Sequence, residues 1–178
     1  MAAFRWVAVL LLILSFTVVK VCCKFEFTNI NCTSLDPEFM DVAECFLKSA
    51  NRTYKYLTLK TRFYKLPINN IMIRVKVLKR LNGYKPFLYD FTLDGCKYLK
   101  GKQNQLIQFF YDMFAPYSNV NHTCPYNHDV YVEKLPISYL DHRVTVVLPV
   151  PEGYYCIHST FSTEKRAVFD LKVYFQIS

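Results

Sequence analysis

The chain lacks the short sequence signatures of the common enzyme classes. It contains no Gly-x-Ser-x-Gly elbow, no His-Glu-x-x-His, no phosphate loop and no glycine-rich dinucleotide fingerprint. His128 and Asp129 are neighbours, but adjacent residues on a strand face opposite ways, so they cannot act together as a base and its orienting group. The sequence therefore predicts a protein that is not an enzyme, with no catalytic residue and no cofactor.

Metal-binding motifs are also missing. After residue 23 there is no Cys-x-x-Cys pair, and the histidines at positions 122, 128, 142 and 158 do not have the spacing of metal ligands. No metal site is predicted. Internal repeats, low-complexity tracts and linkers are absent too, so nothing in the sequence calls for more than one domain.

The N-terminus carries an uncharged run that is short for a membrane span. Arg5 precedes the apolar residues 6–19, and Lys20 ends them. A transmembrane helix needs about 20 apolar residues, whereas the core of a signal peptide needs about 7 to 15. Residues 1–23 are predicted to be a signal peptide, with an uncleaved anchor as the alternative. Residues 24–178 then form one secreted, extracellular domain.

Acidic residues are scarce. The chain has 22 Lys and Arg against 14 Asp and Glu, and residues 24–178 keep 20 of those basic residues. Export argues against nucleic acid as the partner, which leaves anionic lipid headgroups, acidic glycans or an acidic protein surface. The basic residues concentrate between positions 52 and 85, where there is no Asp or Glu. We expect Arg74, Lys76, Lys79 and Arg80 to form a basic surface, for which a solvated face is the alternative.

Five cysteines remain after residue 23: Cys32, Cys45, Cys96, Cys124 and Cys156. In an exported protein such residues form a disulfide framework, and an odd number leaves one of them over. Three Asn-x-Ser/Thr sequons, at Asn31, Asn51 and Asn121, predict N-glycosylation. Asn31 is the least favoured of these sites, because Cys32 occupies the middle of its sequon.

Most of the chain alternates apolar and polar residues with a period of two, which is typical of strands with one buried face. Residues 71–78 and 87–93 flank Asn82-Gly83 and predict a hairpin with a tight two-residue turn. We expect a two-sheet, immunoglobulin-like β-sandwich or β-cup of about seven to nine strands. The other predicted strands cover residues 24–31, 44–49, 54–64, 130–133, 143–148, 154–161 and 167–177.

One segment breaks this period. Between residues 103 and 115 the apolar residues follow helical spacing, and Pro116 ends the run. The pattern predicts a single short amphipathic helix between Cys96 and Cys124. Such a helix would be either a lid at the mouth of a cup or a cover over a sheet edge.

The inner faces of the predicted sheets are rich in large apolar residues. Two sheets that splay apart would leave an apolar cup for a hydrophobic ligand, whereas tightly packed sheets would form a filled core. Both alternatives stay open from the sequence. The predicted lining residues are Ile73, Val75, Phe91, Phe110, Phe169 and Leu171.

Several motifs resemble known families. Asp-Gly-Cys at 94–96, the Cys-Pro segment at 121–125 and Lys-Leu-Pro at 134–136 resemble the ML lipid-recognition domain of the Niemann-Pick sterol carrier and the ganglioside activator. Nearly the whole of residues 24–178 is similar to a large insect (dipteran) family of secreted proteins without assigned function. The motifs that carry the second likeness lie at 45–48, 51–53, 82–89 and 124–129.

These resemblances imply an exported binder or carrier of a lipid or other small hydrophobic ligand, with a role in chemosensation or lipid presentation. The alternative is a module that binds a receptor protein and carries no lipid, and an enzyme is the third hypothesis. The ML-like Cys-Pro loop, together with proximity along the chain, favours pairing Cys96 with Cys124 and Cys32 with Cys45, which leaves Cys156 free. The runner-up pairs Cys32 with Cys156.

Overall fold

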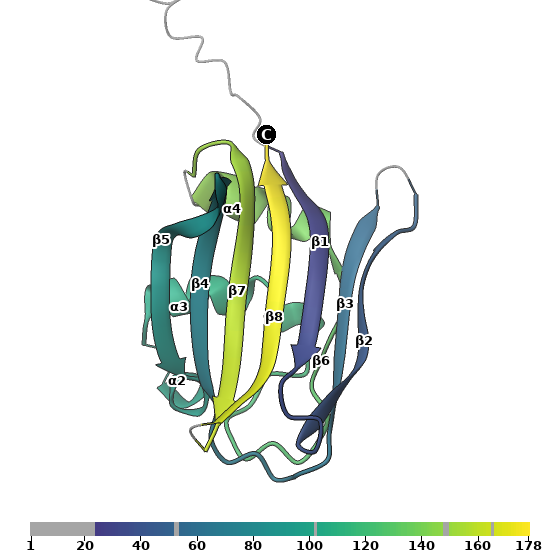
Figure 1. Cartoon of the computed structure of the whole chain (residues 1–178), viewed down its shortest axis with the longest axis vertical. Coiled ribbons are helices and arrows are strands. Elements are labelled where there is room, and N and C mark those ends of the chain that lie inside the picture. Colours follow the sequence, from purple (N-terminus) through teal and green to yellow (C-terminus); the bar gives the residue numbers. More distant parts are fainter. Residues whose placement is uncertain (1–23, 52–53, 102, 148–149, 165) are drawn as a thin grey trace, which may run out of the picture.

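The structure, a computed structural model, describes residues 24–51, 54–101, 103–147, 150–164 and 166–178. The predicted signal peptide lies outside these residues. Eight strands dominate the described part of the chain (Figure 1). Their bounds are β1 Phe25–Ser34, β2 Met40–Ser49, β3 Lys55–Phe63, β4 Met72–Leu81, β5 Gly83–Asp94, β6 Tyr131–Pro136, β7 Gly153–Thr163 and β8 Arg166–Ile177.

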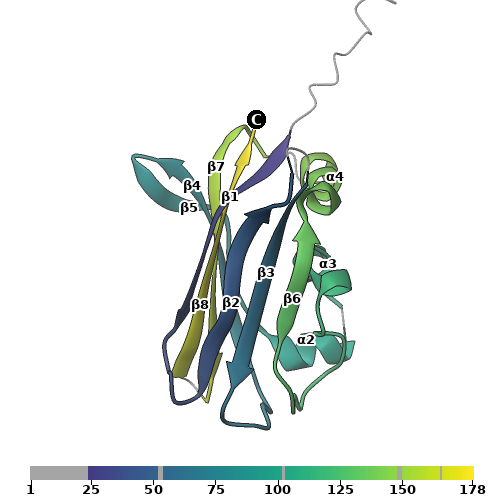
Figure 2. The same cartoon turned by 90° about the vertical axis from the view of Figure 1, so that its right-hand side faces the viewer.

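The strands form two antiparallel sheets that face each other (Figure 2). The larger has five strands in the order β1-β8-β7-β4-β5, and the smaller has three in the order β2-β3-β6. This two-sheet sandwich is the predicted fold class, which is confirmed. It follows from the period of two: along β4, for example, Val75 and Val77 are buried, whereas Arg74, the residue before Val75, is exposed.

The predicted hairpin joins β4 to β5, but its turn is tighter than expected. Leu81 pairs with Gly83 directly across Asn82, and Gly83 has a φ of 86°, a left-handed conformation that glycine adopts without steric cost. Further along the hairpin the register shifts between Lys76 and Leu78. The extra residues on β5 form a bulge, in which Leu88 has a φ of 63°.

Three α-helices occur among the described residues, where the sequence predicted one. They are α2 Gly95–Gly101, α3 Gln105–Asp112 and α4 Ile137–Val147, and a short 3-10 turn, η1 Ala115–Tyr117, follows α3. The predicted helix over 103–115 corresponds to α3. Its first turn is capped by the side chain of Asn104, which accepts a hydrogen bond from the Ile107 amide at 3.1 Å.

The prediction of a strand over 143–148 is wrong, because α4 occupies that part of the chain. Its β-branched residues favour a strand locally, but Leu140 and Val144 lie one helical turn apart and are both buried. Asp141 also accepts a hydrogen bond from the amide of Phe25 at 2.7 Å, which ties the helix to β1. Tertiary contacts have therefore overridden local propensity.

The two sheets differ in width, and the helices make up the difference. Contacts and a disulfide place β1 beside β2. At the other edge of the larger sheet, β4 and β5 extend beyond the three strands of the smaller one (Figure 1). The helices α2 and α3 lie behind β4 and β5, in the layer of the smaller sheet beyond β6 (Figures 1 and 2). Among the described residues, no helix is both long and apolar enough to cross a membrane.

The sheets are joined at their β1–β2 side by a covalent bond and an ion pair. Cys32 of β1 is bonded to Cys45 of β2, as expected from the sequence. Near the other end of β1, the ammonium group of Lys55 lies 2.7 Å from the carboxylate of Glu26, and this hydrogen bond holds the pKa of Glu26 below its ordinary value. This side of the sandwich is therefore closed, and an opening has to lie elsewhere.

We predict that changing Cys32 and Cys45 together to serine lowers the free energy of unfolding by about 3 kcal/mol, because the bond closes a loop with a sequence separation of 13. Urea denaturation followed by circular dichroism measures the change. Reduction of the wild-type protein should produce at least as large a loss, since it also opens Cys96–Cys124. An unchanged unfolding midpoint in the double variant would contradict the prediction.

Candidate functional site

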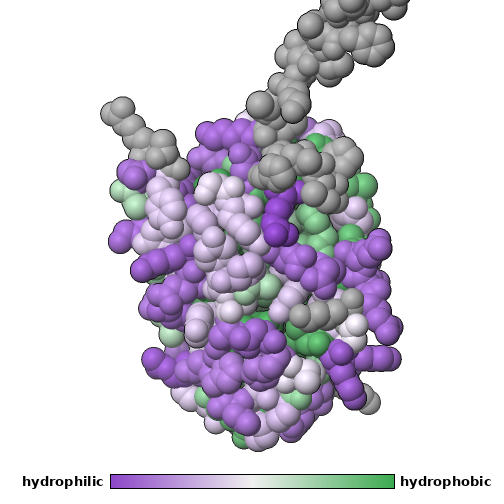
Figure 3. Space-filling view, turned by 180° about the vertical axis from the view of Figure 1, so that it is seen from behind, coloured by the Kyte–Doolittle hydropathy of each residue, from purple (hydrophilic) through white to green (hydrophobic). Residues whose placement is uncertain are grey.

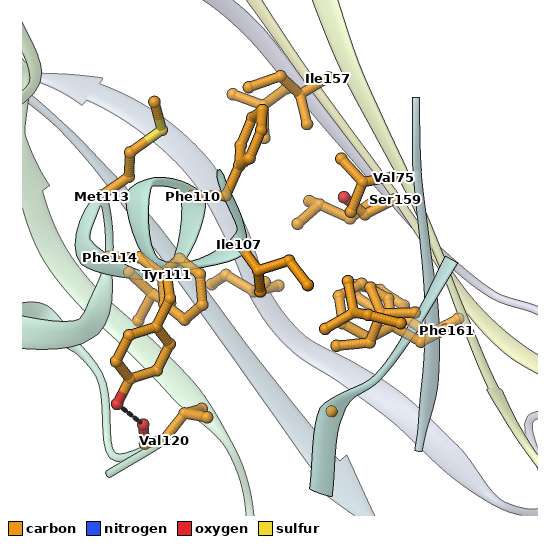
Figure 4. Close-up of a pocket in the computed structure, with 18 of the residues that line it drawn as sticks. Val75, Ile107, Phe110, Tyr111, Met113, Phe114, Val120, Ile157, Ser159 and Phe161 are labelled. Atoms are coloured by element: carbon orange, nitrogen blue, oxygen red, sulfur yellow. Dashed lines mark hydrogen bonds between the residues drawn. The ribbon is translucent and has the colours of Figure 1, made fainter. Parts of the chain in front are cut away.

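A large apolar cavity lies between the two sheets and beneath the helices. Its volume is about 360 Å³, and its walls come from both sheets and from α2, α3 and α4. Figure 4 shows part of it, with Ile107, Phe110 and other α3 residues facing Val75, Ile157 and Phe161 of the larger sheet across a gap. The cavity therefore sits where the larger sheet has a helix opposite it instead of a strand.

No charged side chain is among the described residues that line the cavity. Most hydroxyl groups of its walls are bonded within the protein: Thr61 donates to the Val130 carbonyl at 2.8 Å, and Tyr111 donates to the Val120 carbonyl at 2.7 Å. Tyr98 likewise donates to the side chain of Gln108 at 2.7 Å. The walls thus offer very few polar groups to a ligand.

All six residues predicted to line a cavity do so. Ile73 and Val75 project from β4, and Phe91 from β5. Phe110 of α3 packs its ring 5.7 Å from that of Phe91, so the helix and the hairpin meet at this edge. Sequence reasoning missed the walls supplied by other segments, because only the folded chain brings them together: Phe25, Phe27, Leu140, Val144, Tyr126 and Tyr155.

Helix α3 is only partly buried. None of its residues is fully buried, although Leu106, Ile107, Phe109 and Phe110 are apolar. At the last residue of the helix, Tyr139 of α4 donates a hydrogen bond to the carbonyl of Asp112 at 2.9 Å. A helix that packed on a filled core would bury its apolar face more fully. The partial burial fits a helix that stands over a space (Figure 4).

The helical excursion is tied down at its base. Cys96, the second residue of α2, is bonded to Cys124, the other pairing expected from the sequence. Just before it, Gly95 passes so close to β4 that a Cβ atom there would lie 2.8 Å from Cγ2 of Ile71. Glycine at this position lets α2 approach the sheet and close the cavity at that end.

Two histidines, His122 and His128, lie together beside the cavity, although their spacing in the sequence did not indicate a shared site. Their Nε2 atoms, from His122 and His128, are 3.0 Å apart, and His122 stacks on the cavity-lining ring of Tyr126. Structural zinc sites need four ligands, and the described residues contain no group of three His, Cys, Asp or Glu that could hold a metal. The pair alone is too small a donor set for such a site.

The side chains of His128 and Asp129 are not hydrogen-bonded to each other. The Nδ1 atom of His128 lies 2.8 Å from the backbone carbonyl of Asp129, whereas the carboxylate of Asp129 accepts a hydrogen bond from the Phe63 amide at 2.8 Å. The carboxylate is therefore engaged in joining β3 to the segment before β6. It does not orient the imidazole.

The basic run 52–85 is split between the two sheets and partly neutralised. Lys55 and Lys60 belong to β3 and pair with acidic residues of β1, β2 and β6, while Arg74 of β4 makes a double hydrogen bond to Asp90 of β5, both at 3.0 Å. Strand pairing brings acids from distant parts of the sequence beside several of these cations, so the predicted basic surface is partly neutralised. Lys76 lies opposite Asp90 as well.

Lys79 and Arg80 differ from these residues. They have no ion-pair partner among the described residues and lie over aromatic rings instead. The ammonium group of Lys79 is 5.4 Å from the ring centre of Phe87, and the guanidinium of Arg80 is 5.7 Å from that of Tyr154. Of the predicted basic surface, these two residues keep uncompensated charge.

The predicted glycosylation sites are all exposed. Asn31 lies in β1 beside the bonded Cys32 and pairs with Lys172 across the sheet, whereas Asn121 lies in the loop before Cys124. Asn51 lies just after β2, and the rest of its sequon falls outside the described residues. Glycosylation stays a prediction at each position.

Comparisons with known proteins gave one family model that matches part of the chain and solved structures with low similarity. Residues 73–157 match a family model described as a protein of unknown function (DUF1091). Among solved structures, the chain is similar to a Niemann-Pick type C2 protein from Japanese carpenter ant, at 15% identity and a TM-score of 0.34, over 85% of this chain and 90% of that chain. A search of curated proteins gave no match. A likeness this low says nothing about a ligand, so the site has to be judged on its own geometry.

The free cysteine lies on the opposite side of the larger sheet from the cavity. Cys156 is 1% exposed, and it sits between Leu78 and Tyr174 in neighbouring strands. Burial raises the pKa of its thiol to about 11, because the thiolate would lose its hydration. A neutral, covered thiol is a poor nucleophile, so Cys156 is suited to packing.

We predict that Cys156 reacts extremely slowly with iodoacetamide in the native protein. At pH 8 a thiol with a pKa of about 11 holds about a hundredfold less thiolate than one with the ordinary value of 9.0, and burial adds a steric barrier. Mass spectrometry after timed labelling should show one modification in urea and almost none without it. Rapid stoichiometric labelling of the native protein would contradict this assignment.

Proposed function

We propose that this protein is a secreted, non-enzymatic carrier that binds a small hydrophobic ligand in the cavity between its sheets. The observation that carries the proposal is a cavity of about 360 Å³ whose described walls contain no charged side chain. Its volume falls within the range of about 300 to 1,000 Å³ that is usual for ligand pockets. Catalysis has no comparable support, because the described residues that line the cavity include no pair suited to acid–base or nucleophilic chemistry.

The energetics support an occupied cavity. An apolar space that no side chain fills costs stability, because the atoms of its walls lose packing contacts. A space of about 360 Å³ is large for an ordinary domain, whose whole stability is only about 5 to 15 kcal/mol. Water does not compensate, because it needs polar partners that these walls barely supply. An apolar ligand would remove most of the cost.

The walls also define the class of ligand. At about 30 Å³ for each water-sized group, the cavity holds about a dozen methylene-sized groups. Each buried methylene contributes about 0.8 kcal/mol, so a chain of this size binds through apolar burial alone. A charged headgroup would find no counter-charge inside. The favoured ligand is therefore an acyl chain, sterol-like ring system or other hydrocarbon, with any polar end at the mouth.

Helix α3 is the candidate lid. Phe110 and Ile107 project into the cavity, while no residue of the helix is fully buried (Figure 4). From the side opposite to that of Figure 1, apolar patches reach the surface among hydrophilic residues (Figure 3). A modest movement of α3 would admit a ligand without breaking strand pairing. Export is supported by the two disulfides, which persist in oxidising compartments.

We predict that a tryptophan introduced by Phe110→Trp reports ligand binding, since residues 24–178 contain no other tryptophan. Its fluorescence should shift and saturate as a fatty acid or sterol is added, while the far-ultraviolet circular dichroism stays unchanged. Phe46→Trp is the control, because Phe46 lies at the surface of β2, is 37% exposed and does not line the cavity. No saturable shift across fatty acids, sterols and long-chain hydrocarbons would favour the alternative, a module that binds a receptor protein.

A second prediction distinguishes a cavity from a filled core. Ser159 of β7 is buried and faces the space (Figure 4), so Ser159→Leu should occupy part of it and weaken ligand binding at least tenfold without loss of stability. In a filled core the same change would overpack and destabilise the protein by about 1 to 3 kcal/mol. Thr92→Leu adds similar bulk on the exposed face of β5 and should change neither quantity. Urea denaturation and ligand titration give the two readouts.

A further inference from the structure

The half of the β4–β5 hairpin nearer its turn, from the bulge at Leu88 to the turn at Asn82, carries apolar residues that nothing in the described chain covers. Leu81 is 67% exposed and Leu88 is 62% exposed, more than any other large hydrophobic residue described. Tyr84 and Tyr154 are also exposed at this end. Exposed apolar residues scattered singly need no explanation, but a cluster at one tip marks an interaction surface.

The geometry makes this end accessible. In Figure 2 the turn end of β4 and β5 bends away from the rest of the sandwich, whereas the smaller sheet lies on the other side of the larger one. The outer side of the tip is supported by ring packing between Tyr84 and Tyr174, whose centres are 5.4 Å apart. The Tyr84–Tyr174 contact thus supports the hairpin on its outer side, while Leu81 and Leu88 stay exposed and can contact another surface.

The same end is basic. Lys79 pairs directly with Lys85 across the hairpin, a juxtaposition of like charges that is unfavourable without a counter-charge. Arg80 follows Lys79 in β4, opposite Tyr84, and lies over the ring of Tyr154. One acidic residue, Glu152, lies near this end. The next residue, Gly153, lies close to the side chain of Lys79. Three cations against one carboxylate leave the tip positively charged.

The tip is also next to an opening of the cavity. Leu88 lines the cavity although it is 62% exposed, so the cavity reaches the surface at this residue. Its φ of 63° is unusual for leucine and turns the side chain out of the regular strand alternation. The bulge therefore places one side chain where the inner space and the exposed tip meet.

We propose that the β4–β5 hairpin end docks onto an anionic lipid bilayer, with Leu81 and Leu88 inserted among the lipids and Lys79, Arg80 and Lys85 contacting the headgroups. Apolar residues flanked by cations match the two layers that such a membrane presents: hydrocarbon below and negative charge above. The docking itself does not depend on the proposed cargo. One consequence of docking does rest on the proposed function: the cavity mouth at Leu88 would face the bilayer, so a lipid could pass between the cavity and the membrane.

A bilayer explains these features better than a protein partner. Insertion of a small projecting tip needs no complementary shape, and the two most exposed large hydrophobic residues described, Leu81 and Leu88, both belong to this hairpin. A protein interface of ordinary size involves about 20 to 30 residues on each side, with a flat or shaped core. The position of the cavity mouth at the same place adds a reason for contact with lipid in particular.

Co-sedimentation with sucrose-loaded vesicles tests the proposal on the full secreted chain. We expect binding to phosphatidylcholine vesicles that contain phosphatidylserine, reduced when salt is raised because the Debye length shortens. Leu81→Ser with Leu88→Ser should weaken partitioning at least tenfold, since burial of even one leucine is worth more than a tenfold change in affinity. Lys79→Glu, Arg80→Glu and Lys85→Glu together should abolish the preference for phosphatidylserine.

Matched controls lie at the opposite end of the sandwich (Figure 1). Leu35 and Leu66 are 44% and 43% exposed, and Lys97 and Lys100 are exposed on α2, so the same substitutions there should leave vesicle binding unchanged. Equal loss in these controls, equal binding to pure phosphatidylcholine, or no binding to either vesicle would overturn the proposal. Leu81→Ser, introduced into the Phe110→Trp protein, should retain the ligand-induced fluorescence shift in solution. A failure of the carrier function would thus be distinguishable from a failure of docking.

Discussion

The two sheets have unequal widths, and much of the molecule follows from that constraint. Three strands cannot cover the inner face of five, so β4 and β5 would expose rows of apolar residues to water. Adding strands to the smaller sheet would close the space with interdigitating side chains. Instead, α2 and α3 cover the inner face of β4 and β5, and helices leave gaps there that a layer of strands would not leave. A cavity of about 360 Å³ is the consequence.

The same constraint explains where the covalent bonds lie. Cys32–Cys45 closes the side at which β1 and β2 meet, and Cys96–Cys124 ties the base of the helical excursion. Both stabilise the frame without filling the interior. A protein that tolerates an apolar cavity loses packing energy, and disulfides are a source of stability that does not depend on interior packing. The bonds and the cavity are therefore compatible parts of one architecture.

Much of the frame could be predicted from local pattern, and the failures have physical causes. Val75 and Phe91 alternate with polar neighbours, so a period of two was enough to place β4 and β5 and their inner faces. The segment that forms α4 was misread, because its β-branched residues have strand propensity and its burial depends on β1. Arg74 was read as a free cation because Asp90, its partner, is brought beside it only by pairing of the strands.

The sequence by itself determined the strands, the helix over α3 and the apolar character of the interior, since periodicity and composition act through neighbouring residues. Only the tertiary structure decided whether that interior was filled. Packing density depends on which side chains face each other across the two layers, and Phe110 and Val75 face each other from elements far apart in the sequence (Figure 4). It likewise decided which cations stay unpaired and that Leu88 lies at an opening, because these are properties of distances between segments and not of any segment alone.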